Sequence, residues 1–473
     1  MSYSTDAMRA PDHPLPIPPT RRSARNGRTR MLRVCRWLVV LLTVGLVIDT
    51  GVVSAQDEEQ SVFGTLTYTD PETNDRVPVE GGLITVEGVG SAPSEADGSF
   101  RIGLPEPGEY VVSIDPEGLP EGVFLDDPDR AVLTVNVQEG GNQIVLFRLT
   151  VLDEADRGST SGGITGRRVA QLTAEGLKQG LYLAMAAIGL SMIFGTTGLT
   201  NFAHAELVTF GMLGTYFFNF YGLAGVIGFL APLPPPFGDG MNLVFAAVFG
   251  MLAGGTLGWA INRFIFRGAR RSGVSLLAQM LMTIGLSILL RYIFLYVFRG
   301  GPRTFGQFTA QRAVKIGPIE LTPKDMIAMS LAIIILILVG VFLQLTRTGK
   351  AMRAVSDNRE LAESTGINVE RVISTVWVSG AALAALGGTF FGLTQIRWDF
   401  GFRNLLLLFA AVVLGGLGTA YGALLGALIV GLAINLSTIV IDAELKNMVA
   451  LLVMVVILLV RPQGILGRPE RIG

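Results

Sequence analysis

The chain of 473 residues contains one cysteine, two histidines and a charged fraction of only 16%. The single cysteine, Cys35, excludes an intrachain disulfide and a cysteine-rich metal site, so cysteine pairing says nothing about the redox compartment. Two histidines, His13 and His204, are too few for a multi-histidine metal centre. The 37 basic and 38 acidic residues leave a formal net charge of -1, which provides no overall attraction to nucleic acid. We therefore expect no metal, no cofactor and no nucleic acid partner.

Apolar residues, in contrast, are abundant. They make up 50% of the chain, and the mean hydropathy of +0.51 lies outside the range of soluble globular proteins. A surplus of this size must face lipid. The sequence therefore predicts a mainly α protein, a polytopic membrane helical bundle, and the lipid bilayer is its first expected partner.

The N-terminal segment, residues 1–55, is rich in proline, then in arginine, and ends in an apolar run from Trp37 to Ile48. A basic flank, a short apolar run and the small residues Val53 and Ala55 are typical of a secretory signal peptide cleaved before Gln56. An uncleaved anchor helix that extends to Val53 remains the alternative. In both cases the residues that follow emerge outside the cell.

Residues 56–152 show short alternating strands, separated by Gly, Pro, Asp and Asn, of which Leu83 to Glu87 and Tyr110 to Ile114 are examples. This spacing predicts a small extracytoplasmic antiparallel β-sandwich. The blocks Asp97-Gly98-Ser99-Phe100 and Pro107-Gly108-Glu109-Tyr110 resemble the carboxypeptidase-regulatory-like β-sandwich. A linker rich in Gly, Ser and charge is expected at 153–173.

Three acidic residues in this module, Asp126, Asp127 and Asp129, raise the question of calcium binding. They lack the spacing of an EF-hand loop. We interpret them as part of a solvated face.

Residues 174–473 are dominated by long uncharged runs, which predict a transmembrane domain. Arginines after residue 262 and in the loop 346–372 mark the cytoplasmic side, because basic residues accumulate there. A cytoplasmic C-terminus then requires the stretch 405–441 to cross twice, with a bend at Gly415 to Gly418. About nine crossings result: 180–194, 207–230, 241–264, 274–298, 326–345, 373–396, two within 405–441, and 447–460.

One predicted outer loop, 299–324, conflicts with this topology because it is rich in basic residues. A possible internal repeat supports the topology, since glycine breaks at Gly195 to Gly198 and at Gly415 to Gly418 each separate two apolar runs. Both pairs would run in the same direction, which predicts a parallel repeat. Interrupted helices place transporter sites near the bilayer midplane. Small residues can equally serve close helix packing, and both readings stay open.

Polar residues at the first break are candidates for a substrate pathway. Asn201, His204 and Glu206 lie between two apolar runs, where an ionisable group costs about 2.5–3.5 kcal/mol on insertion scales. His204 and Glu206 are two residues apart and therefore lie on different helix faces, which argues against a proton relay between them. A helix-capping role for Asn201 and an interfacial position of the charges are the alternatives.

The cytoplasmic loop from Thr346 to Asn368 is the most polar segment among the spans, and its composition predicts short amphipathic helices broken at Gly366. Such helices can lie on the lipid surface or bind in the groove of a soluble partner. The blocks from Thr346 to Val355 and from Gly366 to Val369 resemble the coupling region of branched-chain amino acid ABC-transporter permeases, the high-affinity hydrophobic amino acid/urea importer type.

Three further blocks resemble the same family and occur in its order: 201–206, 412–418 with 422–426, and 461–467. The resemblance implies a permease that works with a second permease subunit, two cytoplasmic ATPase subunits and an extracytoplasmic substrate-binding protein. The implied substrates are branched-chain or other hydrophobic amino acids, or urea and short amides. The implied location is the cell membrane, with the β domain outside and the C-terminus in the cytoplasm.

The resemblance also assigns residues. The expected substrate pathway consists of Asn201, Phe202, His204, Glu206, Gly415, Gly416 and Gly418. The expected ATPase-coupling residues are Arg347, Gly349, Arg353, Glu360, Ala362 and Gly366. Leu361 departs from the E-A-A pattern of importer coupling loops. The chain has no nucleotide-binding motif of its own, because Gly349-Lys350 is followed by Ala351 and lacks the upstream glycine. We therefore expect a permease and not an enzyme.

Two other classes are compatible with a membrane bundle that carries an outside module. An ion-coupled secondary carrier would need no ATPase. A membrane receptor would use the β domain as a sensor, but no recognisable soluble effector domain follows Arg461.

Overall fold

A computed structural model describes residues 60–69, 76–116, 118–120, 122–125, 131–137, 142–145, 147–151, 166–226, 240–308, 311, 313–441, 445–461 and 463–467. The expected signal segment 1–55 and the acidic residues Asp126, Asp127 and Asp129 lie outside these ranges. Most of the expected linker also lies outside them, but the first helix begins at Gly166, inside the range assigned to that linker.

The N-terminal module consists of strands. They are β1 Gln60–Thr65, β2 Thr67–Thr69, β3 Arg76–Pro78, β4 Leu83–Val86, β5 Gly90–Pro93, β6 Ser99–Leu104, β7 Gly108–Ile114, β8 Phe124–Leu125, β9 Val132–Val137, β10 Asn142–Ile144 and β11 Arg148–Thr150. They form sheets of order β10-β1-β6, β3-β2-β11-β8 and β5-β4-β7-β9. Alternate residues of β6 point inward, since Phe100, Ile102 and Leu104 are buried. The module therefore has its own apolar core.

The expectation of a purely antiparallel module is wrong for two strand pairs. β1 pairs with β10 in parallel, with Ser61 opposite Asn142, and β2 pairs with β11 in parallel, with Tyr68 opposite Leu149. Alternation along a strand shows which residues point inward, but it does not show which distant strand becomes the neighbour.

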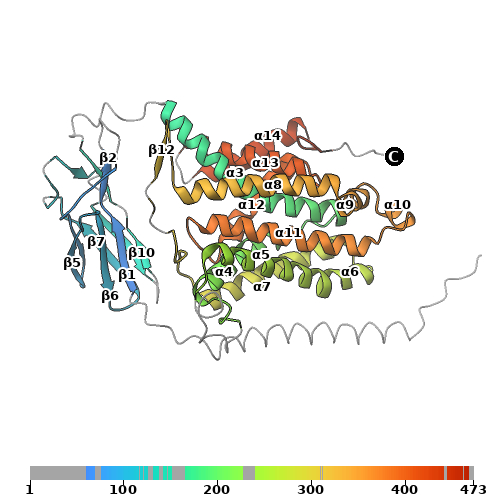
Figure 1. The fold of residues 1–473 in the computed structure, drawn as a ribbon, viewed down its shortest axis with the longest axis horizontal. Helices are drawn as coiled ribbons and strands as arrows, with labels where there is room; N and C mark the ends of the chain where they lie inside the picture. Colours follow the sequence, from blue (N-terminus) through green and yellow to red (C-terminus); the bar gives the residue numbers. More distant parts are fainter. Residues whose placement is uncertain are drawn as a thin grey trace, which may run out of the picture. The chain divides into compact units, whose positions relative to one another are not determined.

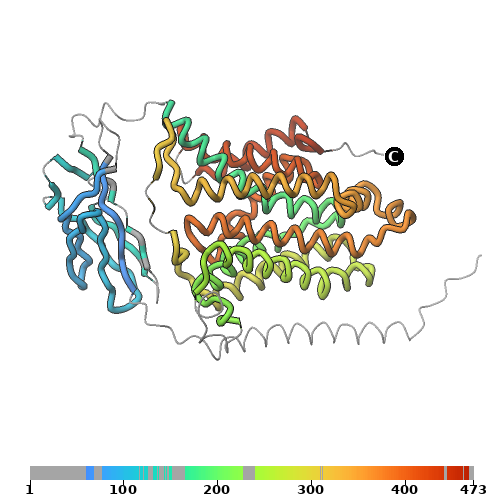
Figure 2. Tube along the Cα trace, viewed as in Figure 1, coloured from blue at the N-terminus to red at the C-terminus, as the bar shows by residue number. Residues whose placement is uncertain are grey.

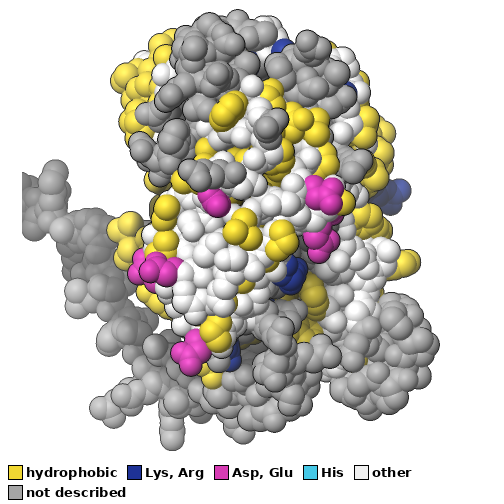
Figure 3. All heavy atoms as spheres, turned by 90° about the vertical axis from the view of Figure 1, so that its left-hand side faces the viewer, with side chains coloured by type: hydrophobic (Ala, Val, Ile, Leu, Met, Phe, Trp, Pro, Cys, Tyr) yellow, Lys and Arg dark blue, Asp and Glu magenta, His cyan; other side chains and the backbone are white. Residues whose placement is uncertain are grey.

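Acidic side chains on this side of the molecule are dispersed. On the face in Figure 3, Asp and Glu side chains occur at several places, among apolar, uncharged and a few basic side chains. No group of three or more His, Cys, Asp or Glu side chains suited to a metal ion occurs in the described ranges.

The C-terminal part is a bundle of helices (Figures 1 and 2). Its helices are α3 Gly166–Thr197, α4 His204–Tyr221, α5 Leu243–Ala260, the π-helical η3 Ile261–Phe266, α6 Arg267–Arg271, α7 Leu276–Phe298, α8 Pro323–Leu345, α9 Arg347–Asp357, α10 Arg359–Ser364, α11 Val369–Gly392, α12 Phe400–Gly415, α13 Ala420–Ser437 and α14 Lys446–Val460. A hairpin of β12 Val314–Ile316 and β13 Ile319–Leu321 precedes α8.

Polar caps set the starts of four consecutive helices. The side chains of Thr322, Thr346, Asn358 and Asn368 each accept a hydrogen bond from a backbone N–H in the first turn of α8, α9, α10 and α11. The capping residues therefore explain why the loop between α8 and α11 forms two separate short helices.

The number of membrane crossings is not confirmed as nine. Among the described residues, six helices are long and apolar enough to span a bilayer: 166–197, 243–271, 276–298, 323–345, 369–392 and 420–437. α12 and α14 are apolar but shorter, and α4 is not among the six. The predicted break between α12 and α13 is present, since Gly416 and Gly418 have φ values of 108° and 80°.

Two ends of the bundle can be defined from contacts. At the hairpin end, Gln171 near the start of α3 donates a hydrogen bond to the Glu320 carbonyl of β13. At the loop-helix end, Gly195 near the end of α3 packs beside Ser356 of α9. Helices α3 and α11 form the interior, with 83% and 72% of their apolar windows buried.

The helix pairs α3–α4 and α12–α13 run in the same direction, as the predicted parallel repeat requires. Each pair turns at the loop-helix end, because Gly195 and Gly418 are neighbours there. The pairs differ in which helix begins after a non-helical segment. In the first pair it is the second helix, α4, which begins at His204, whereas in the second pair it is the first helix, α12, which begins at Phe400. The halves are therefore not copies of one another.

Small residues bring the interior helices into close contact. Gly189 of α3 lies against Gly380 of α11, and Gly388 of α11 lies against the carbonyl of Val208 in α4. A Cβ atom at either α11 position would meet backbone. The close-packing interpretation of the small residues is therefore correct for these pairs.

Two basic residues of loop 299–324 have partners within the bundle. Arg303 donates to the Tyr216 hydroxyl at 2.7 Å, and Lys324 donates to the Leu393 carbonyl at 3.1 Å. These side chains fasten the loop to α4 and to the end of α11. The basic excess of this loop still conflicts with the predicted topology.

Candidate functional site

The start of α4 lies in the middle of the bundle. The Nε2 atom of His204 is 3.1 Å from the Ala186 carbonyl. At 1.5 Å per residue, Ala186 is about 14 Å along α3 from Gly195 and roughly 22 Å from Gln171. The backbone between α3 and α4 is non-helical at this depth, and Asn201, His204 and Glu206 are buried. Such backbone is tolerated only where protein or water surrounds it.

His204 and Glu206 point to different helices, as their spacing predicted. His204 contacts α3, whereas the Glu206 carboxylate accepts a hydrogen bond from Ser287 of α7 at 3.2 Å. Asn201 accepts from the backbone N–H of Ala203 at 3.1 Å, but Ala203 is the N-cap of α4 and no side chain caps this helix, so Asn201 is not its capping residue. Three buried polar atoms, Nδ2 of Asn201, Nδ1 of His204 and Oε2 of Glu206, have no hydrogen-bond partner within the described part of the chain.

A polar stripe on α7 faces this start. Gln279, Thr283 and Ser287 are the polar residues buried on a helix that otherwise exposes apolar side chains. They are spaced four residues apart and therefore share one face. Thr283 accepts from the backbone N–H of Phe202 at 3.1 Å. Sequence periodicity could have found this stripe, since polar residues at four-residue intervals interrupt a uniformly apolar helix.

The start of α12 is a second interrupted helix beside the first. Gly401 donates its backbone N–H to the Thr209 hydroxyl of α4 at 2.8 Å. Here Asp399 pairs with Arg397 at 3.1 Å and with Arg403. We call Arg397, Asp399 and Arg403 the α12 charge cluster. Sequence reasoning missed it, because it fell between the two expected spans 373–396 and 405–441.

An arginine of α7 links the two helix starts. The guanidinium of Arg291 lies 4.1 Å from the ring centroid of Phe402 and interacts electrostatically with the Glu206 carboxylate. Its Nε atom is buried and has no hydrogen-bond partner among the described residues. Ser287 of α7 bonds to Glu206 of α4, and Arg291 of α7 lies over the Phe402 ring of α12, so α7 contacts both helix starts.

The glycine breaks meet at the loop-helix end. The Ser191 hydroxyl of α3 donates to the Thr419 carbonyl at 3.0 Å. The C-terminal segment packs on the same junction, because Ile465 and Leu466 donate their backbone N–H groups to Leu414 and Gly415 at 2.9 Å. Gly415, Gly416 and Gly418 therefore do not lie with His204 and Glu206; the expected pathway residues divide between mid-depth and this end.

A cavity of about 960 Å³ opens at this junction. Both glycine breaks line it, and so does α9 through Arg353, Ser356 and Asp357. It therefore brings an expected coupling residue, Arg353, and an expected pathway residue, Gly418, to one space.

The loop helices α9 and α10 present the expected coupling residues in different ways. Arg347, Arg353 and Glu360 are exposed, whereas Gly349 and Ala362 are buried. A Cβ atom at Gly349 would meet the carbonyls that end α8, so this position requires close packing. Gly366 follows α10 with φ +86°, and no atom lies near its Cβ position. Glycine is favoured at position 366 because of its positive φ, and not because a side chain would collide with a neighbour.

A salt-bridge junction ties these loop helices to the bundle. Glu370 in the first turn of α11 pairs with Arg267 at 3.3 Å, with Arg270 at 3.4 Å and with Arg359 of α10 at 3.9 Å. Arg270 also donates to the buried Asn262 of η3 at 2.8 Å. Helices α6 and α10 thus share one carboxylate at the start of α11.

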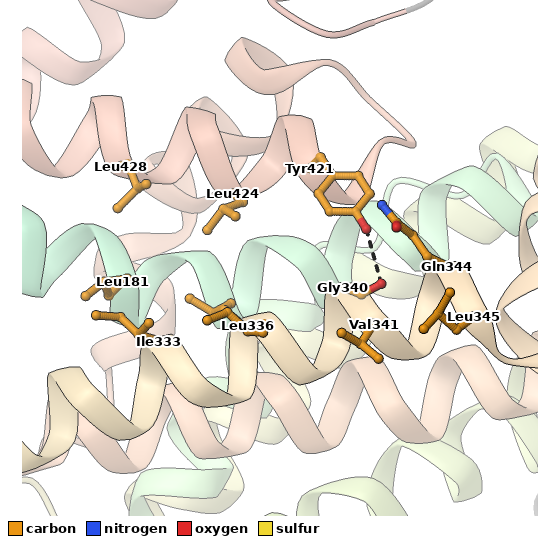
Figure 4. Close-up of a pocket in the computed structure, with 11 residues that line it drawn as sticks. Leu181, Ile333, Leu336, Gly340, Val341, Gln344, Leu345, Tyr421, Leu424 and Leu428 are labelled. Atoms are coloured by element: carbon orange, nitrogen blue, oxygen red, sulfur yellow. Dashed lines mark hydrogen bonds between the residues drawn. The ribbon is translucent and has the colours of Figure 1, made fainter.

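A second, apolar groove of about 450 Å³ lies between α8 and α13 against α3 (Figure 4). Leu181, Leu336 and Leu424 line it, and the Tyr421 hydroxyl donates to the Gly340 carbonyl at 3.2 Å. None of its lining residues is charged. It is therefore not suited to a charged substrate.

Together, the bundle, its two interrupted helices and its polar cavity define a membrane transport subunit. Residues 172–458 match the family described as branched-chain amino acid transport system, permease component, and the chain belongs to this family. It is the permease subunit of an ABC importer, a multi-pass protein of the cell membrane and not an enzyme. Membership implies ATPase and substrate-binding partners.

Individual relatives cover the bundle. The high-affinity branched-chain amino acid transport system permease protein LivH of Escherichia coli K12 is 32% identical to this chain. The match covers 62% of this chain and 94% of LivH. The corresponding protein BraD of Pseudomonas aeruginosa is 29% identical over 63% of this chain and 96% of its own. The fructose import permease protein FruG of Bifidobacterium longum is 25% identical over 52% of this chain and 69% of its own.

Proposed function

We propose that this permease imports branched-chain or other hydrophobic amino acids. The observation that carries the proposal is the likeness to LivH over nearly the whole of that protein. Urea and short amides are the alternative substrates. The relative FruG supports testing a sugar as well.

The proposed complex contains a second permease subunit, two cytoplasmic ATPase subunits and an extracytoplasmic substrate-binding protein. Arg347, Gly349, Arg353, Glu360, Ala362 and Gly366 are proposed to couple the ATPases to the bundle. Exposed side chains on α9 and α10 support this role, and the Glu370 junction supplies a connection to α11. ATPase closure would then bias the bundle toward outward or inward access.

We assign the substrate pathway to Asn201, Phe202, His204 and Glu206 at mid-depth, with Gly415, Gly416 and Gly418 at the loop-helix end. Buried polar groups at bilayer depth are costly and are usually functional, which supports the first set. The cavity of about 960 Å³ beside Gly418 supports the second. The β module is proposed to lie outside the cell, delivered by the basic and apolar segment 1–55.

The test is uptake by the whole complex in proteoliposomes. The assembled transporter should accumulate labelled leucine when ATP is inside the vesicles and the binding protein is outside. Fructose and urea serve as competing candidates in the same vesicles. Uptake that follows an ion gradient without the ATPase subunits would contradict an ABC importer, and uptake of fructose or urea alone would contradict the amino acid assignment.

A further inference from the structure

The apolar groove between α8 and α13 is about as long as one lipid leaflet is deep. On α8 it runs from Ile333 to Leu345, which is about 18 Å at 1.5 Å per residue. A hydrocarbon core of about 30 Å gives each leaflet about 15 Å. Leu345 is the last residue of α8, so the groove begins at the loop-helix end. Leu181 and Leu336 are buried at its floor, whereas Ile333 and Ile337 on its rim are exposed (Figure 4). The groove is therefore open toward the bilayer.

This groove adjoins the polar cavity of the loop-helix end. Gln344 of α8 and Tyr421 of α13 line both spaces. Arg353 of α9 lines the cavity and donates from Nη2 to the Gln344 carbonyl at 3.3 Å, so its side chain lies where the two spaces meet. Asp357, one turn further along α9, also lines the cavity. An apolar groove one leaflet long thus ends beside an exposed arginine.

The arrangement matches the shape and chemistry of a phospholipid. Aliphatic side chains along the groove are suited to an acyl chain, and a guanidinium binds phosphate oxygens through paired N–H groups. Pockets between membrane helices that contain basic side chains bind lipid headgroups. Because Asp357 offsets the charge of Arg353, the cavity lining is not of one sign. The expected contact is therefore with the phosphate and not with the net charge of the headgroup.

A helix of another subunit is a poorer match for the groove. Helix contacts in membranes are enriched in small residues that let backbones approach, as at Gly189 and Gly380 in this bundle. Among the described residues that line the groove, Gly340 is the only glycine. The Tyr421 hydroxyl already lies 3.5 Å from where a Cβ atom of Gly340 would be. The other lining side chains are large and would keep a partner helix at a distance.

We propose that the groove and the adjoining part of the cavity bind one phospholipid from the leaflet at the loop-helix end. An acyl chain lies between α8 and α13, and the phosphate accepts hydrogen bonds from Arg353. The bound lipid connects α8, α9 and α13 beside the glycine break at Gly418. This site goes beyond the proposed import and does not depend on which substrate is transported.

Native mass spectrometry of the delipidated complete transporter measures the lipid. Dipalmitoyl phosphatidylglycerol should bind severalfold more tightly than dipalmitoylglycerol, which has the same chains and no phosphate. R353Q should weaken phosphatidylglycerol binding about tenfold, because a charge-assisted contact is lost, and leave dipalmitoylglycerol binding unchanged. R347Q is the control, since Arg347 is an exposed arginine of the same helix that does not line the cavity. Equal binding by R353Q and R347Q overturns the proposal.

Two neighbouring residues of α8 test the groove. Ile337 is 60% exposed and lines it, whereas Leu338 is 59% exposed and does not. I337W should fill the groove and weaken phosphatidylglycerol binding severalfold, and L338W should not. Equal binding by the two variants would indicate lipid of the surrounding bilayer only and overturns the proposal. Loss of another subunit from the I337W complex also overturns it, since the groove would then hold a protein helix. So does displacement of the lipid by glycerol 3-phosphate, which would assign the cavity to a soluble phosphate.

Discussion

Single glycines determine how closely the interior helices approach. At Gly388 the nearest neighbour of a Cβ atom would be the backbone carbonyl of Val208, which cannot move aside as a flexible side chain can. Gly285 of α7 has no neighbour at all within 4 Å of that position. The two glycines therefore have different physical roles, although both lie in apolar helices.

We predict that Gly388→Ala destabilises the bundle, because overpacking typically costs about 1–3 kcal/mol. The thermal midpoint of the detergent-solubilised protein, followed by size-exclusion chromatography, should fall. Gly285→Ala is the control and should keep or slightly raise the midpoint, since alanine favours helix by about 1 kcal/mol. Equal midpoints for the two variants would show that α4 and α11 can separate without cost.

Sequence reasoning found part of the polar site. Asn201, His204 and Glu206 were identifiable because each is polar within an apolar run. Arg397, Asp399 and Arg403 were missed, because charges between two expected spans look like an ordinary solvated turn. The hydrogen bond between Gly401 and Thr209 shows that this turn packs against α4.

At the scale of elements, the end of α10 depends on Gly366. Its N–H bonds to the Glu363 carbonyl at 3.0 Å, and Ile367 bonds to Ala362 at 3.1 Å. The positive φ of this residue is readily adopted by glycine, sometimes by asparagine and poorly by β-branched residues.

We predict that Gly366→Val uncouples ATP hydrolysis from transport, since strain of about 1–3 kcal/mol would redirect α10. The ratio of leucine imported to ATP hydrolysed in proteoliposomes should fall while the subunits still purify together. Gly366→Asn should keep most of the coupling. If valine and asparagine behave alike and normally, the contact with the ATPase lies elsewhere in the loop.

The Glu370 junction makes a second prediction at this scale. Glu370→Gln leaves Arg267, Arg270 and Arg359 without their shared carboxylate, so motion of α10 should reach α11 less efficiently. The measurement is again the ratio of transport to hydrolysis. Glu363→Gln, which changes an exposed acid of α10, is the matched control. Coupling that is equal in both variants would limit the junction to a structural role.

At the scale of the whole molecule, the strand module and the bundle have separate apolar cores. Core residues from Val62 to Leu149 form one cluster, and those from Leu181 to Ala450 form another that shares no residue with it. A shared core would have made the two parts inseparable, whereas separate cores allow each to fold on its own contacts.

We predict that deletion of residues 61–149 leaves the helices inserted and the permease assembled with its ATPases. Protease protection of membrane vesicles and co-purification measure these two properties. The maximal rate of leucine uptake at saturating binding protein should be retained. Failure of insertion would show that the module belongs to the folding core of the permease.

Composition and apolar runs determined the class of this protein, a helical membrane bundle with a strand module, because burial in lipid requires many consecutive apolar residues. The blocks near residues 201, 346, 415 and 461 also determined its family. Tertiary structure alone decided that the glycine breaks meet at one end and that α12 begins beside the first turns of α4. These are contacts between residues far apart in the chain, and local periodicity carries no information about which distant segments pack together.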